Sequence, residues 1–205
     1  MMRGGNDTID FYSPFGAAYG DAQVIQGFVQ CGDDTITAHD NVFAHGVYGA
    51  TLIGDAEQAA GNGIGGNDWI QGDIGNDTIY GDFGVNQNHT VCGNDTIFGG
   101  AGNDRMWGDN FSNTGGVVGG ADTFVFAPGS GQDTIMDFDL GSAYFNHSEG
   151  DVLDVSAYHL NPTIGAGGVM LTDEGGGAVV HLSATDQVTL MGVRSQDLTL
   201  SDFRF

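Results

Sequence analysis

Aspartate residues recur at multiples of nine along this chain, and this register limits the possible fold more than any other feature. The sequence positions of Asp68, Asp77, Asp95, Asp104 and Asp122 differ successively by 9, 18, 9 and 18. A glycine lies two positions before each of these aspartates, and a large apolar residue lies two positions after it. A fixed repeat length indicates a solenoid, because each turn must return the chain to the same place.

Segments of equal length link these units. Each runs from a Gly-Asp pair to the next large apolar residue, and their lengths agree although their compositions differ: 20–36, 54–70, 81–97 and 108–124. With the nine-residue spacing they predict an 18-residue turn of two strand-plus-loop halves. The predicted fold is all-β, a parallel β-roll (a β-helix or solenoid) of nonapeptide repeats whose apolar residues point inward. A flexible linker rich in Gly and Asp is the alternative.

The loops of these repeats suit calcium. Calcium takes 6–8 oxygen ligands, many of them backbone carbonyls, and glycine permits the tight loops that present them. Aspartate outnumbers glutamate, 24 to 3, and its short carboxylate reaches a cation from inside a tight loop. We therefore predict that the chain binds several Ca²⁺ ions as its cofactor. The predicted ligand positions are Asp7, Asp34, Asp68, Asp77, Asp95, Asp104, Asp122, Asp133, Gly66, Gly72, Gly75, Gly81, Gly93, Gly99, Gly100 and Gly102, with Asp73, Asp82, Asp109, Asp137 and Asp151 as second-rank candidates.

The register also predicts where calcium is sparse. Ala50 lies one predicted turn before Asp68, and Gly16 lies one predicted turn before Asp34, so both occupy positions where the repeat has an aspartate. Loading should be densest between Asp68 and Asp133.

The formal net charge is −23, with 4 arginines and no lysine. Such a balance excludes nucleic acid and anionic membrane surfaces as partners, because both attract basic proteins. It also makes the compact calcium-free chain self-repelling. Metal binding and folding are therefore predicted to be one event.

Residues 4–139 resemble the RTX (repeats-in-toxin) family of secreted bacterial proteins, on the pattern GGxGxDxUx seen in Gly99-Gly-Ala-Gly-Asn-Asp104-Arg-Met106. The segment from Asp122 onward is similar to the C-terminal segment that closes the β-roll in serralysin-type proteins. The resemblance implies calcium between successive turns and export by a type I secretion system. It also implies folding outside the cell or on the surface of a Gram-negative bacterium.

Composition and targeting signals agree with this expectation. No apolar stretch reaches the roughly 18 residues of a membrane-spanning helix. The N-terminus lacks the apolar core of a secretory signal peptide. By the resemblance, residues 197–205 form an uncleaved C-terminal signal, although Arg204 interrupts the run of apolar residues that ends some relatives.

Composition changes near residue 140, and we predict two parts: a calcium-binding roll over 1–139 and a capping and secretion-signal region over 140–205. Alternating apolar runs flank Asp173-Glu-Gly-Gly-Gly177, which predicts a hairpin and a small antiparallel C-terminal cap. Residues 142–150 form an insert before this cap.

The cysteines Cys31 and Cys92 each lie three positions before a repeat aspartate. Their separation in sequence exceeds three of the predicted turns, so they should be too distant for a disulfide. They are interpreted as small residues in a variable loop position, with an intermolecular pair as the alternative.

Catalytic motifs are missing from the sequence. It contains neither the HExxH zinc motif nor a Gly-x-Ser-x-Gly elbow, so an enzyme is not expected. Tyr80, Phe98 and Trp107 each follow an inward residue and should point outward, with Tyr80 and Phe98 stacked on adjacent turns. They form either a protective ladder or a contact stripe for a glycan or another protomer.

Two functions remain open. One is a secreted structural, adhesive or matrix protein that folds on extracellular calcium and assembles end to end as a homo-oligomer or filament. The other is the C-terminal folding and secretion module of a larger secreted enzyme or toxin.

Overall fold

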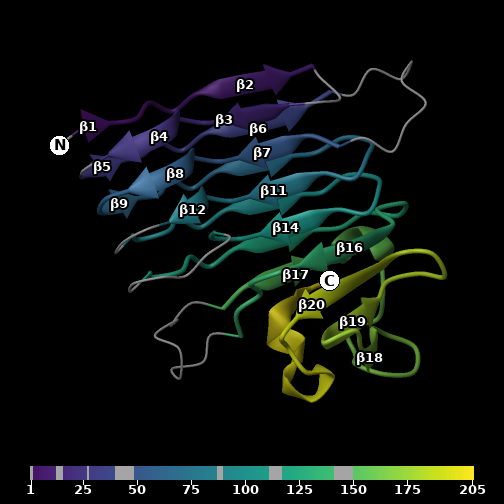
Figure 1. Cartoon of the computed structure of the whole chain (residues 1–205). Coiled ribbons are helices and arrows are strands. Elements are labelled where there is room, and N and C mark those ends of the chain that lie inside the picture. The colour runs from purple at the N-terminus through teal and green to yellow at the C-terminus, as the bar shows by residue number, and fades with distance from the viewer. Residues whose placement is uncertain are drawn as a thin grey trace.

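The computed structural model describes residues 2–12, 16–26, 28–39, 49–86, 90–110, 117–140 and 150–205. Successive coils of the chain stack along one direction, from the N-terminal strands at one end to the C-terminal strands at the other (Figure 1). The described helices are three short 3-10 helices: η1 (Ser156–Tyr158), η2 (Ser195–Asp197) and η3 (Leu200–Asp202). Within these ranges no helix has the length and apolarity needed to cross a membrane.

The strands form two large and two small sheets. In spatial order, the seven-stranded sheet contains β2 (Thr8–Phe11), β6 (Thr35–Ala38), β10 (Trp69–Gln71), β13 (Thr96–Phe98), β15 (Thr123–Val125), β17 (Val152–Asp154) and β21 (Phe203–Arg204). The eight-stranded sheet contains β18 (Met170–Glu174), β19 (Gly177–His181), β20 (Gln187–Met191), β16 (Gln132–Ile135), β14 (Arg105–Trp107), β11 (Thr78–Tyr80), β7 (Thr51–Ile53) and β3 (Ala17–Tyr19). The first small sheet contains β1 (Met2–Arg3), β5 (Val29–Gln30) and β9 (Gly63–Ile64), and the second contains β12 (Phe83–Asn86), β8 (Ala56–Ala60) and β4 (Ala22–Gln26).

One coil of the chain visits both large sheets and the second small sheet before it returns. From β10 the chain bends through residues 72–77 into β11, and Gly81 and Asp82 then lead into β12. Residues 90–95 bring it back to β13, which pairs in parallel with β10. In Figure 1 the strands β4, β8 and β12 accordingly continue beyond the ends of β3, β7 and β11.

The coil is longer than the 18-residue turn predicted from the spacing. Asp68 hydrogen-bonds to Asp95, 27 residues away, while the corresponding separations are 34 residues from Asp34 to Asp68 and 29 from Asp122 to Asp151. A nine-residue half alternates with an 18-residue half, and the longer half carries the additional small-sheet strands. The predicted 18-residue turn was therefore wrong, although the β-roll class is confirmed.

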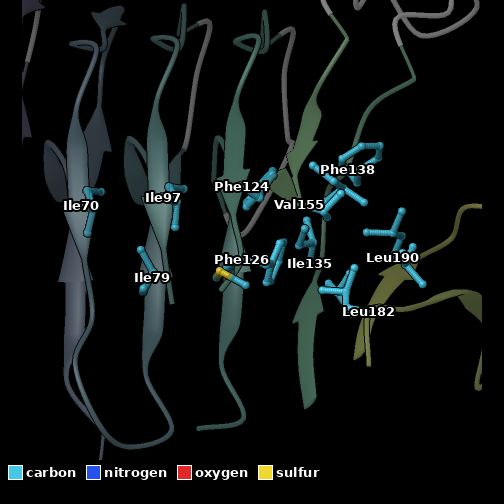
Figure 2. Close-up of a cluster of buried hydrophobic side chains, with 14 of the residues drawn as sticks. Ile70, Ile79, Ile97, Phe124, Phe126, Ile135, Phe138, Val155, Leu182 and Leu190 are labelled. Carbon is cyan, nitrogen blue, oxygen red and sulfur yellow. The ribbon is translucent and has the colours of Figure 1, made fainter. Parts of the chain in front are cut away.

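Two apolar clusters fill the interior. The larger lies between the two large sheets and includes the inward apolar residues of the repeats, such as Ile70, Ile97 and Ile79, each 0% exposed (Figure 2). β10, β11 and β13 bury only their middle residue, as the period of two along a strand requires. The smaller cluster, around Phe83, lies between the two small sheets.

The larger cluster continues through the boundary predicted at residue 140. Its members run from Ala18 to Phe203. The parallel pairings β15–β17 and β16–β20 extend the two large sheets into the C-terminal region. The roll and the C-terminal region thus share one apolar core.

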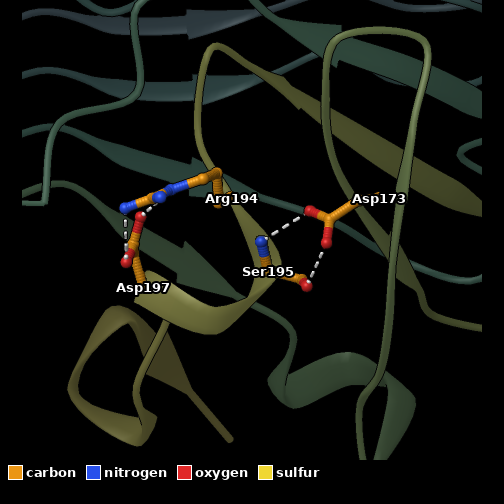
Figure 3. A network of polar contacts seen from close by, with 4 residues as sticks. All are labelled: Asp173, Arg194, Ser195 and Asp197. Atoms are coloured by element: carbon orange, nitrogen blue, oxygen red, sulfur yellow. Dashed lines mark hydrogen bonds and ion pairs between the residues drawn. The ribbon is translucent and has the colours of Figure 1, made fainter.

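The predicted antiparallel cap is confirmed. β18 pairs with β19 and β19 with β20, both antiparallel, and Gly175 and Gly176 form the hairpin turn with φ values of 63° and 95°. Asp173 accepts hydrogen bonds from the backbone N–H and the hydroxyl of Ser195, both at 2.7 Å, while Arg194 pairs with Asp197 (Figure 3). The two hydrogen bonds from Ser195 to Asp173 hold η2 against the hairpin. The predicted insert at 142–150 lies almost wholly outside the described residues.

The outward aromatic residues do not stack as predicted. Tyr80 lies on the eight-stranded sheet and stacks on Trp107 with ring centroids 4.7 Å apart, whereas Phe98 lies on the seven-stranded sheet against Trp69. The 27-residue coil explains this, because positions separated by 18 fall on different sheets. Trp107 is only 5% exposed, since Tyr80 and the guanidinium of Arg105 cover it.

The prediction that Cys31 and Cys92 form no disulfide with each other is confirmed. Both thiols are free and buried. The residue between them in the stack is Gly65, so the cysteines lie two coils apart rather than more than three.

Candidate calcium sites

Aspartates of successive coils stack in two columns inside the fold. The inner column lies where the chain enters the seven-stranded sheet from the small-sheet side, and it contains Asp34, Asp68, Asp95, Asp122 and Asp151. The bend column lies where the chain turns from the seven-stranded to the eight-stranded sheet, and it contains Asp77, Asp104 and Asp133. Each of these side chains is at most 3% exposed.

One hydrogen bond repeats along both columns. The backbone N–H of Asp68 donates to Oδ1 of Asp95 at 2.7 Å, and the N–H of Asp95 donates to Oδ1 of Asp122 at 2.8 Å. In the bend column the N–H of Asp104 donates to Oδ1 of Asp133 at 2.9 Å. One carboxylate oxygen of these aspartates therefore fixes the stacking of coils, and at Asp151 the second oxygen also accepts a backbone N–H, that of Asp139, at 2.8 Å.

At Asp34, Asp68, Asp95, Asp104 and Asp133 the second oxygen is buried and has no hydrogen-bond partner among the residues that the structure describes. Backbone carbonyls lie beside the inner-column atoms of this set: a β-carbon added to Gly81 would meet both Asp95 Oδ2 and the carbonyl oxygen of Gly108. Gly54 has the same relation to Asp68 Oδ2 and the carbonyl oxygen of Gly81. Carboxylate and carbonyl oxygens around one small space form the hard donor set that calcium prefers. The residues present thus fit the ion that the repeats imply.

A second set of aspartates faces the inner column from the other wall of the coil. Asp21, Asp55, Asp82 and Asp109 follow a glycine at the entry to the second small sheet. Carboxylate oxygens of Asp34, Asp55 and Asp68 lie within 4.8 Å of one another. Asp82 Oδ1 accepts the N–H of Gly93 at 2.8 Å, so this set also anchors the loops that lead back to the large sheet.

Burial raises the pKa of these carboxyl groups. It raises the pKa of Asp34 to about 6, that of Asp68 to about 8, that of Asp104 to about 8 and that of Asp133 to about 7. Burial, together with the charge of Asp68, places the pKa of Asp95 well above its usual range. Desolvated like charges therefore oppose one another unless protons or cations neutralise them.

Arginine does not supply that neutralisation. The chain has only 4 arginines, and two of them pair near the C-terminus: Arg194 with Asp197 and Arg204 with Asp154. Arg105 lies over the ring of Trp107 instead. Protons or divalent cations are the other possible sources of positive charge for the columns.

The structure brings most of the predicted ligand residues to these columns. Gly66, Gly81 and Gly93 border the inner column, while Gly72, Gly75, Gly99, Gly100 and Gly102 form the bends. Gly100 and Gly102 have φ values of 100° and 155°, a backbone conformation that is strained for residues with a side chain.

The remaining predicted residues lie as follows. Asp7 is exposed at the N-terminal edge, where its N–H donates to Asp34 Oδ1. Asp73 is half-buried in a bend, and Asp137 accepts the backbone N–H groups of Gly108 and Asp109.

Ala50 lies in the bend column, where its N–H donates to Asp77 Oδ1 at 2.6 Å. It thus occupies an aspartate position of the bend column, in register with Asp77 and not with Asp68 as the 18-residue turn predicted. Gly16 precedes β3 as Ala50 precedes β7, so the two are equivalent.

Sequence reasoning missed Asp21 and Asp55. Both belong to the Gly-Asp pairs that open the equal-length segments, so the signal was present. The same position supplied the second-rank candidates Asp82 and Asp109, and Asp55 is 0% exposed, whereas Asp73 in a nine-residue loop is half-buried. The longer half-coil turns this position inward.

A family model of the RTX calcium-binding nonapeptide repeat, with four copies, matches residues 62–87 and 93–114. The chain carries RTX calcium-binding repeats. The matched residues include β10 to β14, the part of the roll in which both aspartate columns are present. No curated protein matches the chain.

The RTX repeats make a steric prediction at Gly81. We expect Gly81→Ala to raise the calcium concentration needed for folding severalfold, because its methyl group would occupy the space between Asp95 Oδ2 and the Gly108 carbonyl oxygen. No charge changes in this variant. Gly5→Ala is the control, since its nearest neighbour lies 3.8 Å away. Calcium titrations followed by far-ultraviolet circular dichroism measure both, and identical midpoints for the two variants and the wild type would refute the steric argument.

Proposed function

We propose that this protein is a secreted structural component, with an adhesive or matrix role, that folds when calcium enters the two aspartate columns outside the cell. The observation that carries the proposal is the set of buried inner-column carboxylate oxygens that lie beside backbone carbonyls and have no hydrogen-bond partner within the described part of the chain. Several calcium ions would be held between successive coils, most of them between Asp68 and Asp133. Export by a type I secretion system of a Gram-negative bacterium fits a chain that stays unfolded at the low calcium level inside a cell.

A non-catalytic role is part of this proposal. The buried carboxylates form regular ladders along the stack, in which hydrogen bonds between coils occupy one oxygen of each. This regularity serves stacking and metal binding. Glycoside hydrolysis instead uses a single pair of carboxyl groups with different roles.

The structural role includes end-to-end assembly. β1, β2, β3 and β4 are the outermost strands of the four sheets at one end, and β18 and β21 are outermost at the other. Open strand edges are templates for pairing with another chain. Contact between unlike ends of two copies is heterologous and propagates into filaments when it does not close into a ring.

Assembly is tested by light scattering and electron microscopy of the purified chain. In millimolar calcium we expect growth into filaments or larger particles, with reversal after chelation, because calcium is needed to build the edges. Magnesium at the same concentration is the control. Particles that stay monomeric in calcium would favour the second function, a folding and secretion module of a larger RTX enzyme or toxin.

A further inference from the structure

Two aspartates of the second set also lie beside a cysteine thiol. A carboxylate oxygen of Asp82, the Sγ atom of Cys92 and a carboxylate oxygen of Asp109 lie within 4.8 Å of one another, and all three residues are buried. Cys92 comes from the loop before β13, whereas Asp82 and Asp109 come from two successive coils on the opposite wall. We call these three residues the thiol site.

Polar groups around the thiol site are incompletely satisfied. Asp82 is 0% exposed, and its Oδ2 has no hydrogen-bond partner among the described residues. Asn110 is 2% exposed and donates from Nδ2 to Cys92 Sγ at 3.6 Å, while its Oδ1 lacks a partner within the same described ranges. An amide donor aimed at sulfur stabilises the thiolate form that binds metals. A buried amide with one unsatisfied oxygen beside that sulfur is costly unless a ligand completes the site.

The donor set identifies the ligand. Calcium is bound by oxygen alone, so sulfur contributes nothing to its coordination. Cysteine with carboxylates suits zinc, whose ligands lie about 2.3 Å away for sulfur and about 2.0–2.2 Å for oxygen. From these contacts we infer that the thiol site binds one Zn²⁺ ion through Cys92, Asp82 and Asp109, in addition to the calcium ions of the columns. Binding releases the thiol proton to solvent as the zinc–sulfur bond forms, and a modest contraction of the loops brings the donors to these distances.

A second cysteine provides an internal comparison. Cys31 lies between Asp21 and Asp55 in the same way. There the residue that corresponds to Asn110 is Ala56, which has no amide to donate. Both oxygens of Asp55 accept the backbone N–H of Gly66, at 3.2 and 3.3 Å, whereas the equivalent N–H of Gly93 donates to Oδ1 of Asp82. We therefore assign zinc to the thiol site and not to its counterpart at Cys31.

The test uses the full chain in saturating calcium, with the fold verified by circular dichroism, so that failure to fold is distinguished from failure to bind zinc. Cadmium serves as the probe because cadmium–thiolate bonds absorb in the ultraviolet. We expect one equivalent of cadmium to produce this absorption and zinc to displace it. Cys92→Ser should abolish the absorption, Cys31→Ser should retain it, and Asn110→Ala should weaken binding by roughly 10–100-fold.

A measurement on the unmodified chain tests the assignment even if the variants do not fold. Zinc-edge X-ray absorption should detect one sulfur neighbour at about 2.3 Å in the chain loaded with one equivalent of zinc. A folded chain that shows only oxygen or nitrogen neighbours, or that loses the cadmium absorption with Cys31→Ser instead of Cys92→Ser, would overturn the assignment.

Discussion

Removal of calcium at neutral pH is expected to unfold the roll. With both columns empty, the folded chain must keep the buried carboxyl groups of Asp68, Asp95 and Asp122 either protonated or charged without a counter-ion. Both states are costly at neutral pH relative to the ionised groups of the unfolded chain, and the net charge of −23 adds repulsion. Calcium binding offsets both costs, so binding and folding should coincide. We expect half-saturation at ~10⁻⁴–10⁻³ M, the range of extracellular calcium modules. Circular dichroism during chelator addition measures the loss of β-structure.

Magnesium is the matched control for this experiment. Magnesium demands near-ideal octahedral geometry at short distances and gives up water reluctantly, so a cage of carboxylates and fixed carbonyls suits it poorly. The same concentration of magnesium should leave the chain unfolded. A β-rich spectrum that persists in excess chelator would show that the columns do not need metal.

Acidification is expected to restore structure to the calcium-free chain. Burial raises the pKa of Asp34 to about 6, that of Asp133 to about 7 and those of Asp68 and Asp104 to about 8, whereas an unfolded aspartate titrates near 3.9. Between these values the folded state holds more protons than the unfolded state, so its stability falls as the pH rises. The fold should be favoured near pH 4 and lost as the pH rises through about 6 to 8.

The pH series is measured by circular dichroism in chelator, with a parallel series in millimolar calcium. The calcium-loaded chain should stay folded through neutral pH, because cations replace the protons. If the calcium-free chain instead gained β-structure as the pH rose from 4 to 8, the assignment of raised aspartate pKa values to the folded state would be contradicted.

The positions of many candidate calcium ligands can be predicted from the sequence, because the geometry of the repeat loop restricts which residue type occupies each position. An aspartate preceded by glycines and followed by an inward apolar residue specifies one loop, and Asp68, Asp95 and Asp104 lie where the repeats predict. The C-terminal hairpin was equally accessible, since Gly175 and Gly176 adopt the positive φ values that a two-residue turn requires.

The small-sheet side of the coil was not predicted. Its strands, such as β8 with the sequence Ala-Glu-Gln-Ala-Ala, show no alternation of apolar and polar residues that would mark a strand. The alternation of 9 and 18 in the aspartate spacing already adds up to a 27-residue coil, but the longer halves lack a second repeat motif.

The burial and contacts of some single residues also differ from what the local sequence predicts. Trp107 points outward as its strand position requires, yet it is covered by neighbours from adjacent coils. Asp186 lies outside the repeats, yet it is buried and accepts the N–H of Gly129 at 2.9 Å and the hydroxyl of Tyr158 at 3.1 Å. Exposure and long-range contacts of this kind depend on which coils become neighbours, and local sequence does not specify that.

The most direct measurement compares the calcium midpoints of Asp95→Asn, Asp197→Asn and the wild type by circular dichroism. Asp95→Asn keeps the shape of the side chain but removes a charge from the middle of the inner column, where no described residue hydrogen-bonds to Oδ2. Asp197→Asn disturbs only a largely exposed pair with Arg194, of a kind worth ~0–1 kcal/mol. If the columns hold the calcium, Asp95→Asn raises the midpoint severalfold and Asp197→Asn leaves it unchanged. Equal midpoints for both variants would contradict the placement of calcium in the columns.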